Sequence, residues 1–105
     1  MCGRFALYSD AFTLARRFEA DTIPELRPRY NIAPTQNIPI VREKGEKRCF
    51  ALARWGLVPH WAKTIDFGFS TINARAETVA SKPAFRSAFR QRRCLIPADG
   101  YYEFI

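Results

Sequence analysis

The sequence predicts an α+β fold built around antiparallel strands. Apolar residues in 37–42 and 48–57 flank the polar segment 43–47, a pattern typical of a β-hairpin. Apolar residues also recur at helical spacing within 10–19 and again after Ser81. A chain of 105 residues can bury one core, so we expect one domain that combines these strands and helices.

The first helix is expected to follow a short strand over 5–8. Ser9 or Asp10 can cap it, because a side-chain oxygen accepts a hydrogen bond from the first turn. Segment 20–30 contains two prolines and is expected to be a loop. The predicted buried stripe of the first helix consists of Phe12, Ala15 and Phe18.

The second half of the chain is expected to alternate loops, a helix and strands. Residues 64–70 predict a loop, and 72–78 predict a loop or a strand end. Ser81 can cap the second helix with Pro83 in its first turn. Two strands, over 94–97 and 101–105, are separated by an Asp-Gly turn. The predicted buried residues are Phe50, Leu52 and Trp55 in the hairpin and Phe85, Ala88 and Phe89 in the helix.

The charge balance points to a polyanionic partner. Seventeen Lys and Arg residues against ten Asp and Glu give a net charge of +7, and thirteen of the seventeen are arginines. The planar guanidinium group pairs with phosphate through two hydrogen bonds and stacks on bases. The composition therefore fits nucleic acid, with ordinary solubility charge as the alternative.

Several classes of protein are excluded by what the sequence lacks. It contains no apolar run near the ~18 residues of a membrane span and no N-terminal signal core. Three widely spaced cysteines are typical of a reducing compartment, so we expect a cytoplasmic protein, nucleoid-associated if bacterial. One histidine and no CxxC pair predict no metal site, and no cofactor is expected.

Cys2 has a chemistry that internal cysteines lack. Removal of Met1, which a small second residue permits, would expose an amine and a thiol on the same residue. Such a group can condense with an aldehyde and close to a thiazolidine, or act as the nucleophile of an N-terminal-nucleophile hydrolase. The alternative is that Cys2 is simply a small residue after the start.

Other candidate residues also have ordinary alternatives when taken singly. Asn73 can cap a turn, and Glu103 can pair with a surface arginine. His60 and the two tryptophans are more often turn or core residues than catalytic ones. Five segments in a fixed order change this view: MCGRF (1–5), RYNIAP (29–34), WGLVP (55–59), INARAET (72–78) and RCLIPADGYYEF (93–104).

This series closely resembles the SRAP family, the SOS-response-associated peptidase domain. The resemblance implies an α+β fold whose antiparallel strands form a half-open barrel-like sheet with peripheral helices. Residues 1–105 would be the N-terminal portion of one SRAP domain, without its C-terminal part. The resemblance also implies that the family's active-site histidine lies in that later part. His60 stands in a different motif. Phe104 stands where many members have tryptophan.

The resemblance also implies a function and a set of site residues. Family members lose Met1 and use Cys2 to trap abasic sites in single-stranded DNA as a thiazolidine crosslink. The residue matching Asn73 holds the Cys2 end and the opened sugar, and the one matching Glu103 assists proton transfer. The residues matching Arg4 and Arg75 grip phosphates, Asn31 lines the same pocket and Trp61 stacks on a base.

Two other functions remain open at this point. A cysteine peptidase of the N-terminal-nucleophile type would also use Cys2 and Glu103. A non-catalytic module that binds single-stranded DNA would need only the arginines and the aromatic residues. We expect single-stranded DNA with abasic sites as the partner, and neither a metal nor a membrane.

Overall fold

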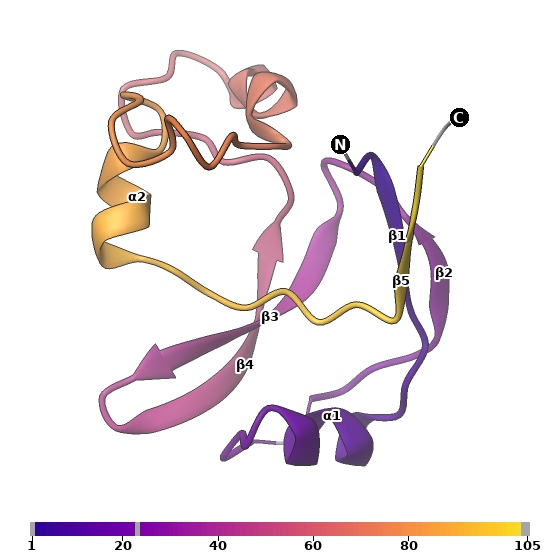
Figure 1. The fold of residues 1–105 in the computed structure, drawn as a ribbon. Helices are drawn as coiled ribbons and strands as arrows, with labels where there is room; N and C mark the ends of the chain where they lie inside the picture. The colour runs from indigo at the N-terminus through magenta and orange to yellow at the C-terminus, as the bar shows by residue number, and fades with distance from the viewer. Residues whose placement is uncertain (1, 23, 104–105) are drawn as a thin grey trace.

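The residues that the structure describes form two antiparallel sheets and three short helices (Figure 1). The computed structural model describes residues 2–22 and 24–103. The predicted α+β class with antiparallel strands is confirmed. One sheet has the order β2-β1-β5 and contains β1 (Arg4–Leu7), β2 (Arg29–Ile32) and β5 (Gly100–Tyr102), and the other is a hairpin of β3 (Asn37–Lys44) and β4 (Lys47–Arg54).

The helices are short. Helix α1 (Ala11–Arg17) begins after Asp10, whose carboxylate accepts the N–H of Thr13 at 2.9 Å, so Asp10 is the cap. The 3-10 helix η1 (Ile65–Thr71) and α2 (Arg86–Gln91) follow the hairpin. Among the described residues, none of these helices combines the length and the apolar character needed to cross a membrane.

The hairpin forms where it was predicted, but its bounds differ. The strands extend to Lys44 and from Lys47, so the turn is shorter than the predicted 43–47, and β4 ends at Arg54 instead of continuing to 57. Pairing runs from Asn37 opposite Arg54 to Lys44 opposite Lys47. Gly45 takes a φ of +66° in the turn, a conformation that glycine adopts without a steric penalty. The prediction that Leu52 is buried is wrong, because Leu52 is 69% exposed in β4.

The core lies between the two sheets and α1. Its apolar contacts bury Phe5 and Leu7 of β1 against Ile38 and Ile40 of β3. The predicted stripe of the first helix is wrong at Phe12, which is 71% exposed, while Leu14 takes the core position. A helix this short buries only the side chains that its neighbours cover, and here the covered face is that of Leu14.

Three further local predictions differ from the structure. Segment 20–30 was expected as a loop, yet β2 begins within it at Arg29 and pairs with β1. The second helix begins only at Arg86, after a series of turns, and Ser81 does not cap it. The segment 64–70, expected as a loop, contains η1. The strand β2 forms because it pairs with β1, which is distant in the sequence, and the local sequence pattern of 20–30 does not indicate this pairing.

The predicted strand over 94–97 is reduced to a single bridge. Leu95 exchanges two backbone hydrogen bonds with Val41, at 2.8 and 2.9 Å, and its neighbours have no strand partner among the described residues. The predicted strand over 101–105 is β5, which pairs with β1, and residues 104–105 lie outside the described residues. This final segment crosses the hairpin on its way from α2 to β5 (Figure 1).

The turn before β5 is fixed to the end of β1. The carboxylate of Asp99 accepts the backbone N–H groups of Tyr8 and Ser9 at 2.7 and 2.9 Å. The N–H of Asp99 in turn donates to the carbonyl oxygen of Ala6 at 2.8 Å. These bonds align β5 beside β1 and set the pairing of Arg4 with Tyr102.

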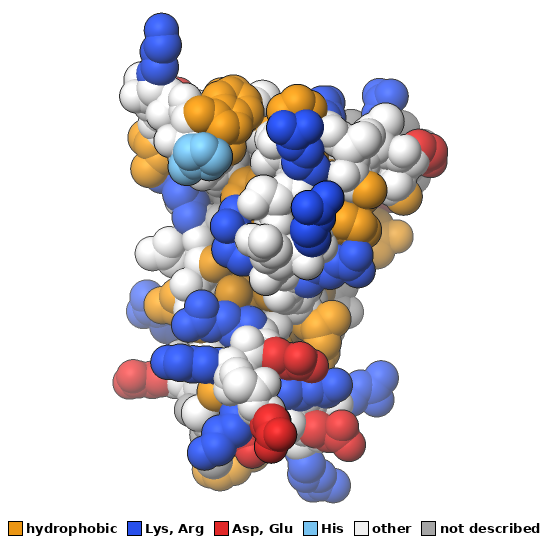
Figure 2. All heavy atoms as spheres, turned by 90° about the vertical axis from the view of Figure 1, so that its left-hand side faces the viewer, with side chains coloured by type: hydrophobic (Ala, Val, Ile, Leu, Met, Phe, Trp, Pro, Cys, Tyr) orange, Lys and Arg blue, Asp and Glu red, His pale blue; other side chains and the backbone are white. Residues whose placement is uncertain are grey.

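The surface is strongly basic on the side that carries α2 and the hairpin turn. Figure 2 shows this side, with Lys and Arg side chains spread over it and most of the Asp and Glu side chains gathered toward its lower end. Part of the excess of positive charge in the composition is thus exposed on this face.

Candidate functional site

Cys2 lies directly before β1 and is half-buried. Its thiol donates a hydrogen bond to the carbonyl oxygen of Arg4 at 3.3 Å. Its own carbonyl oxygen accepts a hydrogen bond from the side-chain amide of Asn73 at 2.9 Å. These two residues are 71 positions apart in the chain, so the tertiary fold alone brings them together.

The end of β4 holds the segment that carries Asn73. The indole N–H of Trp55 donates to the carbonyl oxygen of Ile72 at 2.8 Å. The hydroxyl of Thr71 donates to the carbonyl oxygen of Leu57 at 2.6 Å. Two hydrogen bonds directly before Asn73 therefore fix its backbone, and its amide points at Cys2 as a consequence.

Glu103 reaches the same region from the other side. It follows β5 directly, and β5 pairs antiparallel with β1 so that Tyr102 lies opposite Arg4. Glu103 therefore directly follows the residue opposite Arg4, and Cys2 stands two residues before Arg4. The bonds of Asp99 described above thus set the position of Glu103 through the pairing of the two strands.

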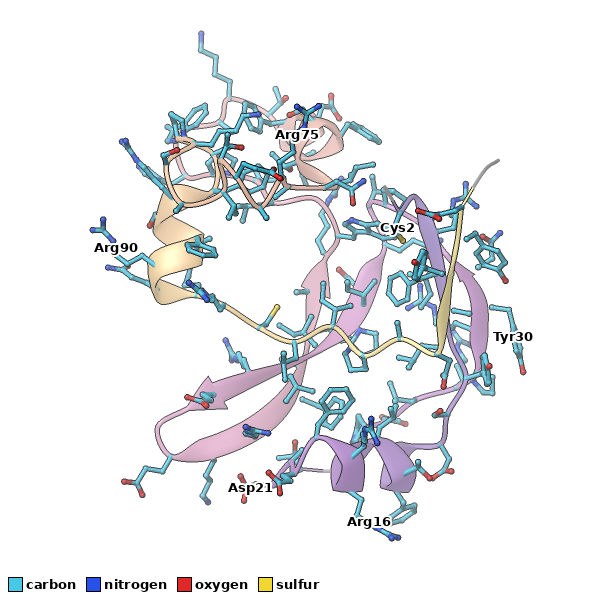
Figure 3. The ribbon with its side chains drawn as sticks, in the orientation of Figure 1. Cys2, Arg16, Asp21, Tyr30, Arg75 and Arg90 are labelled. Atoms are coloured by element: carbon cyan, nitrogen blue, oxygen red, sulfur yellow. The ribbon has the colours of Figure 1, made fainter. Side chains whose placement is uncertain are left out.

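Cys2, Asn73 and Glu103 line one pocket of about 460 Å³. The rest of its lining is mostly apolar and comes from β1, β3, β5, the residues that directly follow β4 and η1, and the segment before β5. Figure 3 shows Cys2 at the end of β1, facing the space between the two sheets. The other lining residues are Phe5, Ile38, Trp55, Ile72, Ile96, Ala98 and Tyr101.

Arg4 and Asn31 lie beside this pocket but do not line it. The guanidinium of Arg4 donates to the side-chain oxygen of Asn31 at 3.0 Å, across the pairing of β1 with β2. The amide oxygen of Asn31 therefore orients Arg4 on the exposed side of the sheet. Both residues are exposed, and Arg4 stands two residues after Cys2 in the chain.

Trp61 and Arg75 lie outside the pocket. Trp61 is half exposed, and its ring contacts that of Phe67 edge-on at a centroid distance of 5.1 Å. Arg75 lines a separate depression of about 630 Å³ together with Lys82. In Figure 3, Cys2 lies at the start of β1, whereas Arg75 lies on the loop segment that follows η1. His60 is exposed and lines none of these cavities.

Sequence reasoning missed two residues that form the walls of the pocket. Trp55 was expected only as a core residue, yet it lines the pocket and packs on Phe5 at a centroid distance of 5.5 Å. Tyr101 was expected only as part of a strand, and it lines the pocket from β5. Trp55 stands in the segment WGLVP, and Tyr101 stands two residues before Glu103 in RCLIPADGYYEF. Their place in these segments was the sequence feature that could have indicated a role in the site.

The other cysteines offer no comparable group. Cys94 is an exposed residue, but partial burial of its thiol raises its pKa and favours the protonated form. The part of the chain that the structure describes contains no group of three or more His, Cys, Asp or Glu side chains that could hold a metal ion.

Comparison with known proteins decides the family. The sequence matches the family described as SOS response associated peptidase (SRAP) over residues 1–104. The chain belongs to the SRAP family. The family predicted from the five segments is thereby confirmed, and this SRAP chain contains all of them in the matched range.

Related proteins share the whole length of this SRAP chain. The abasic site processing protein YoaM of Bacillus subtilis (strain 168) is 46% identical over 107 residues, which cover 99% of this chain and 47% of YoaM. The abasic site processing protein HMCES of Pongo abelii is 33% identical over 128 residues, which cover 99% of this chain and 36% of HMCES. The SRAP chain thus spans about half the length of the bacterial relatives it matches.

The fold also matches a solved structure. A crystal structure of a protein from Bordetella bronchiseptica superposes with a TM-score of 0.76 at 27% sequence identity. The match covers 97% of this SRAP chain and 50% of that chain. The antiparallel α+β arrangement described above is therefore shared with a larger protein.

Proposed function

We propose that this chain captures abasic sites in single-stranded DNA through a thiazolidine crosslink at Cys2. The observation that carries the proposal is the contact of Asn73 with the carbonyl oxygen of Cys2, in a pocket that Glu103 also lines. Two relatives in the SRAP family bear the name abasic site processing protein, which supports the same substrate.

The reaction begins after Met1 has been removed. An abasic deoxyribose opens to an aldehyde, and the α-amine of Cys2 attacks the aldehyde carbon to give a carbinolamine. Loss of water from the carbinolamine gives an imine. The sulfur of Cys2 then attacks the imine carbon, and the nitrogen takes up the proton that the thiol released. The sum is one thiazolidine and one water molecule, with no oxidation or reduction.

Glu103 is the residue we propose for proton transfer. Loss of water requires a proton on the departing oxygen, which a carboxyl group within the pocket can supply. The apolar walls formed by Trp55 and Tyr101 limit access of bulk water to the imine. Asn73 holds the backbone of Cys2, so that amine and thiol stay oriented toward the pocket.

The flanking strand is held by residues outside the pocket. Arg4, oriented by Asn31, and Arg75 are proposed to contact phosphates on either side of the lesion. Trp61 presents a half-exposed ring on which a base can stack. None of these contacts reads a base edge, so we expect capture to be independent of sequence.

Incubation with an oligonucleotide containing one abasic site tests the proposal. The expected result is a heat-stable band of lower mobility in a denaturing gel, which Cys2→Ala abolishes. Mass spectrometry of the digested adduct should locate the DNA on the N-terminal residue. Protein that retains Met1 should give no adduct, because its α-amine does not belong to Cys2.

Cys94→Ala is the matched control, because Cys94 is a free cysteine outside the pocket. Its crosslink yield should equal that of the wild type. An adduct that survives Cys2→Ala, or that Cys94→Ala removes, would exclude the proposed chemistry.

The name of the family supports a second candidate, an N-terminal-nucleophile peptidase. It would use the same Cys2 and Glu103, so these two residues do not separate the candidates. Peptide turnover in the absence of any abasic-site adduct would favour the peptidase. Salt-sensitive DNA binding that ignores both the lesion and Cys2→Ala would instead indicate a non-catalytic binding module.

A further inference from the structure

A second cavity lies on the basic side of the molecule, apart from the pocket of Cys2. It measures about 660 Å³ and lies between the β3–β4 hairpin, α2 and the segment that follows α2. We call it the arginine groove, because Arg42, Arg48, Arg90 and Arg93 all line it. Glu43 is the one acidic residue in its described lining.

Two arginines of the groove have their charge available. Arg42 and Arg90 are exposed, and neither forms a hydrogen bond or ion pair with another residue in the described part of the chain. Arg48 is already engaged, since it donates to the carbonyl oxygen of Phe18 at 3.0 Å and lies 3.8 Å from a carboxylate oxygen of Glu19. The groove therefore carries an excess of unneutralised positive charge.

Arg93 is held in a fixed orientation. Its Nε–H donates to the carbonyl oxygen of Phe89 at 2.7 Å, and its guanidinium carbon lies 3.7 Å from the centroid of the Phe89 ring. The Nε–H bond and the stacking leave the four N–H groups on the two terminal nitrogens for a ligand. A guanidinium fixed in this way loses little conformational entropy when it binds a phosphate.

The lining of the groove favours phosphates over bases. No aromatic side chain is among its described lining residues, so it has no surface on which a base would stack. The groove is also separate from the capture pocket. Cys94 and Leu95 line the groove, whereas Ile96 and Ala98 line the pocket, so the segment before β5 divides the two cavities.

We propose that the arginine groove binds the phosphodiester backbone of a nucleic-acid strand, as a second contact remote from Cys2. This inference rests on the proposed function only in taking nucleic acid as the partner. The fit is one of charge, because a run of phosphates needs several cationic groups along a groove and no base readout. In Figure 3, Arg90 extends outward from α2 on the side opposite β5.

The test is the salt dependence of noncovalent binding to an unmodified, fluorescently labelled oligothymidine of about 30 nucleotides, followed by anisotropy. We expect the double variant Arg42→Gln/Arg90→Gln to lower the slope of log K against log [salt] by about 1.4, because each phosphate contact contributes about 0.7 for a single strand. The charge-preserving variant Arg42→Lys/Arg90→Lys should restore most of the slope.

Arg16→Gln/Arg17→Gln is the matched control. It removes the same charge from two exposed residues of α1, neither of which lines the groove. An equal fall in slope for both double variants would overturn the proposal, because net charge alone would explain it. Equal weakening of oligothymidine and of poly-glutamate by the groove variant would also overturn it.

The outcome for the groove can be separated from the outcome for Cys2. The anisotropy experiment uses DNA without a lesion, so it needs no crosslink. We expect the groove variant to form the crosslink at an unchanged rate with an abasic oligonucleotide of about five nucleotides, because the proposed reaction takes place in the pocket and none of the substituted residues lines it. A slope that the groove residues do not alter contradicts this inference and leaves the capture proposal intact.

Discussion

Asn73 is the side chain that connects the segment after η1 to Cys2. Its amide donates to the carbonyl oxygen of Cys2 at 2.9 Å, so the bond holds the backbone of Cys2 at the pocket. A neutral hydrogen bond of this kind contributes about 1 kcal/mol. If the bond orients the amine in the transition state, this energy corresponds to about fivefold in rate.

We therefore expect Asn73→Ala to slow crosslink formation about fivefold to tenfold. The measurement is the rate of adduct formation in single-turnover gels, with the melting temperature as a check on folding. Asn37→Ala is the control, because the Asn37 side chain makes no hydrogen bond with another described residue. Equal rates for Asn73→Ala and the wild type would remove Asn73 from the site.

Asp99 gives a prediction about pH. Burial raises the pKa of this carboxyl, but hydrogen bonds from the Ser9 hydroxyl and from the N–H groups of Tyr8 and Ser9 outweigh burial. The net pKa therefore lies below the ordinary value of 3.8. Between the two values the unfolded chain binds more protons than the folded one, so stability falls as the pH falls through this range.

Asp99→Asn should lower the melting temperature by about 4–8 °C near pH 7, because a charge-assisted acceptor is lost. The difference in melting temperature between the wild type and Asp99→Asn should become smaller as the pH is lowered below 3.8, because the wild-type carboxyl then becomes protonated. Thermal melts across this range provide the measurement. A difference that stays constant down to the most acidic sample would show that the ionised form contributes nothing.

At the scale of elements, a close contact between two glycines holds η1 against the end of β4. Gly56 takes a φ of +114°, and a Cβ atom built there would lie 2.6 Å from the carbonyl oxygen of Gly68. This contact is backbone against backbone, so neither side can yield cheaply. Asn73 follows η1 by two residues, so this contact holds the element that leads to the pocket.

Gly56→Ala should therefore destabilise the fold by about 2–3 kcal/mol, through the strained φ and the clash together. This corresponds to a loss of about 10 °C or more in melting temperature. Gly45→Ala is the matched control, because Gly45 also has a positive φ but has nothing within 4 Å of its added Cβ. We expect Gly45→Ala to lower the melting temperature by about half as much as Gly56→Ala. Equal decreases for the two variants would show that the clash with Gly68 has no effect.

At the scale of the whole molecule, the net charge of +7 favours the noncovalent binding of DNA that precedes the crosslink. Noncovalent binding of single-stranded DNA releases counterions, so its affinity falls steeply with salt. A thiazolidine is covalent and is insensitive to salt once it has formed. The proposed function therefore predicts two states of the complex that respond differently to ionic strength.

We expect binding by Cys2→Ala to weaken at least tenfold between about 50 and 200 mM salt. The wild-type adduct with an abasic strand should survive the same change. Filter binding before and after a high-salt wash measures both states. Loss of the wild-type adduct in the wash would show that no covalent bond had formed.

The sequence determined the features that depend on near neighbours. Asp10 caps α1 because its carboxylate reaches an N–H three residues away. The hairpin forms because two apolar segments flank a polar turn that contains Gly45. The five quoted segments were also sufficient to predict the family, because they match along the chain and need no contact between them.

Only the tertiary structure decided which distant segments meet. β2 was missed because its pairing with β1 is a property of two segments, and neither one alone reports it. Phe12 is exposed and Leu14 buried because neighbouring elements cover one face of α1 and leave the other open. The site depends on the same kind of contact. Asn73 and Glu103 reach Cys2 through hydrogen bonds and strand register that span most of the chain, and local periodicity carries no information about them.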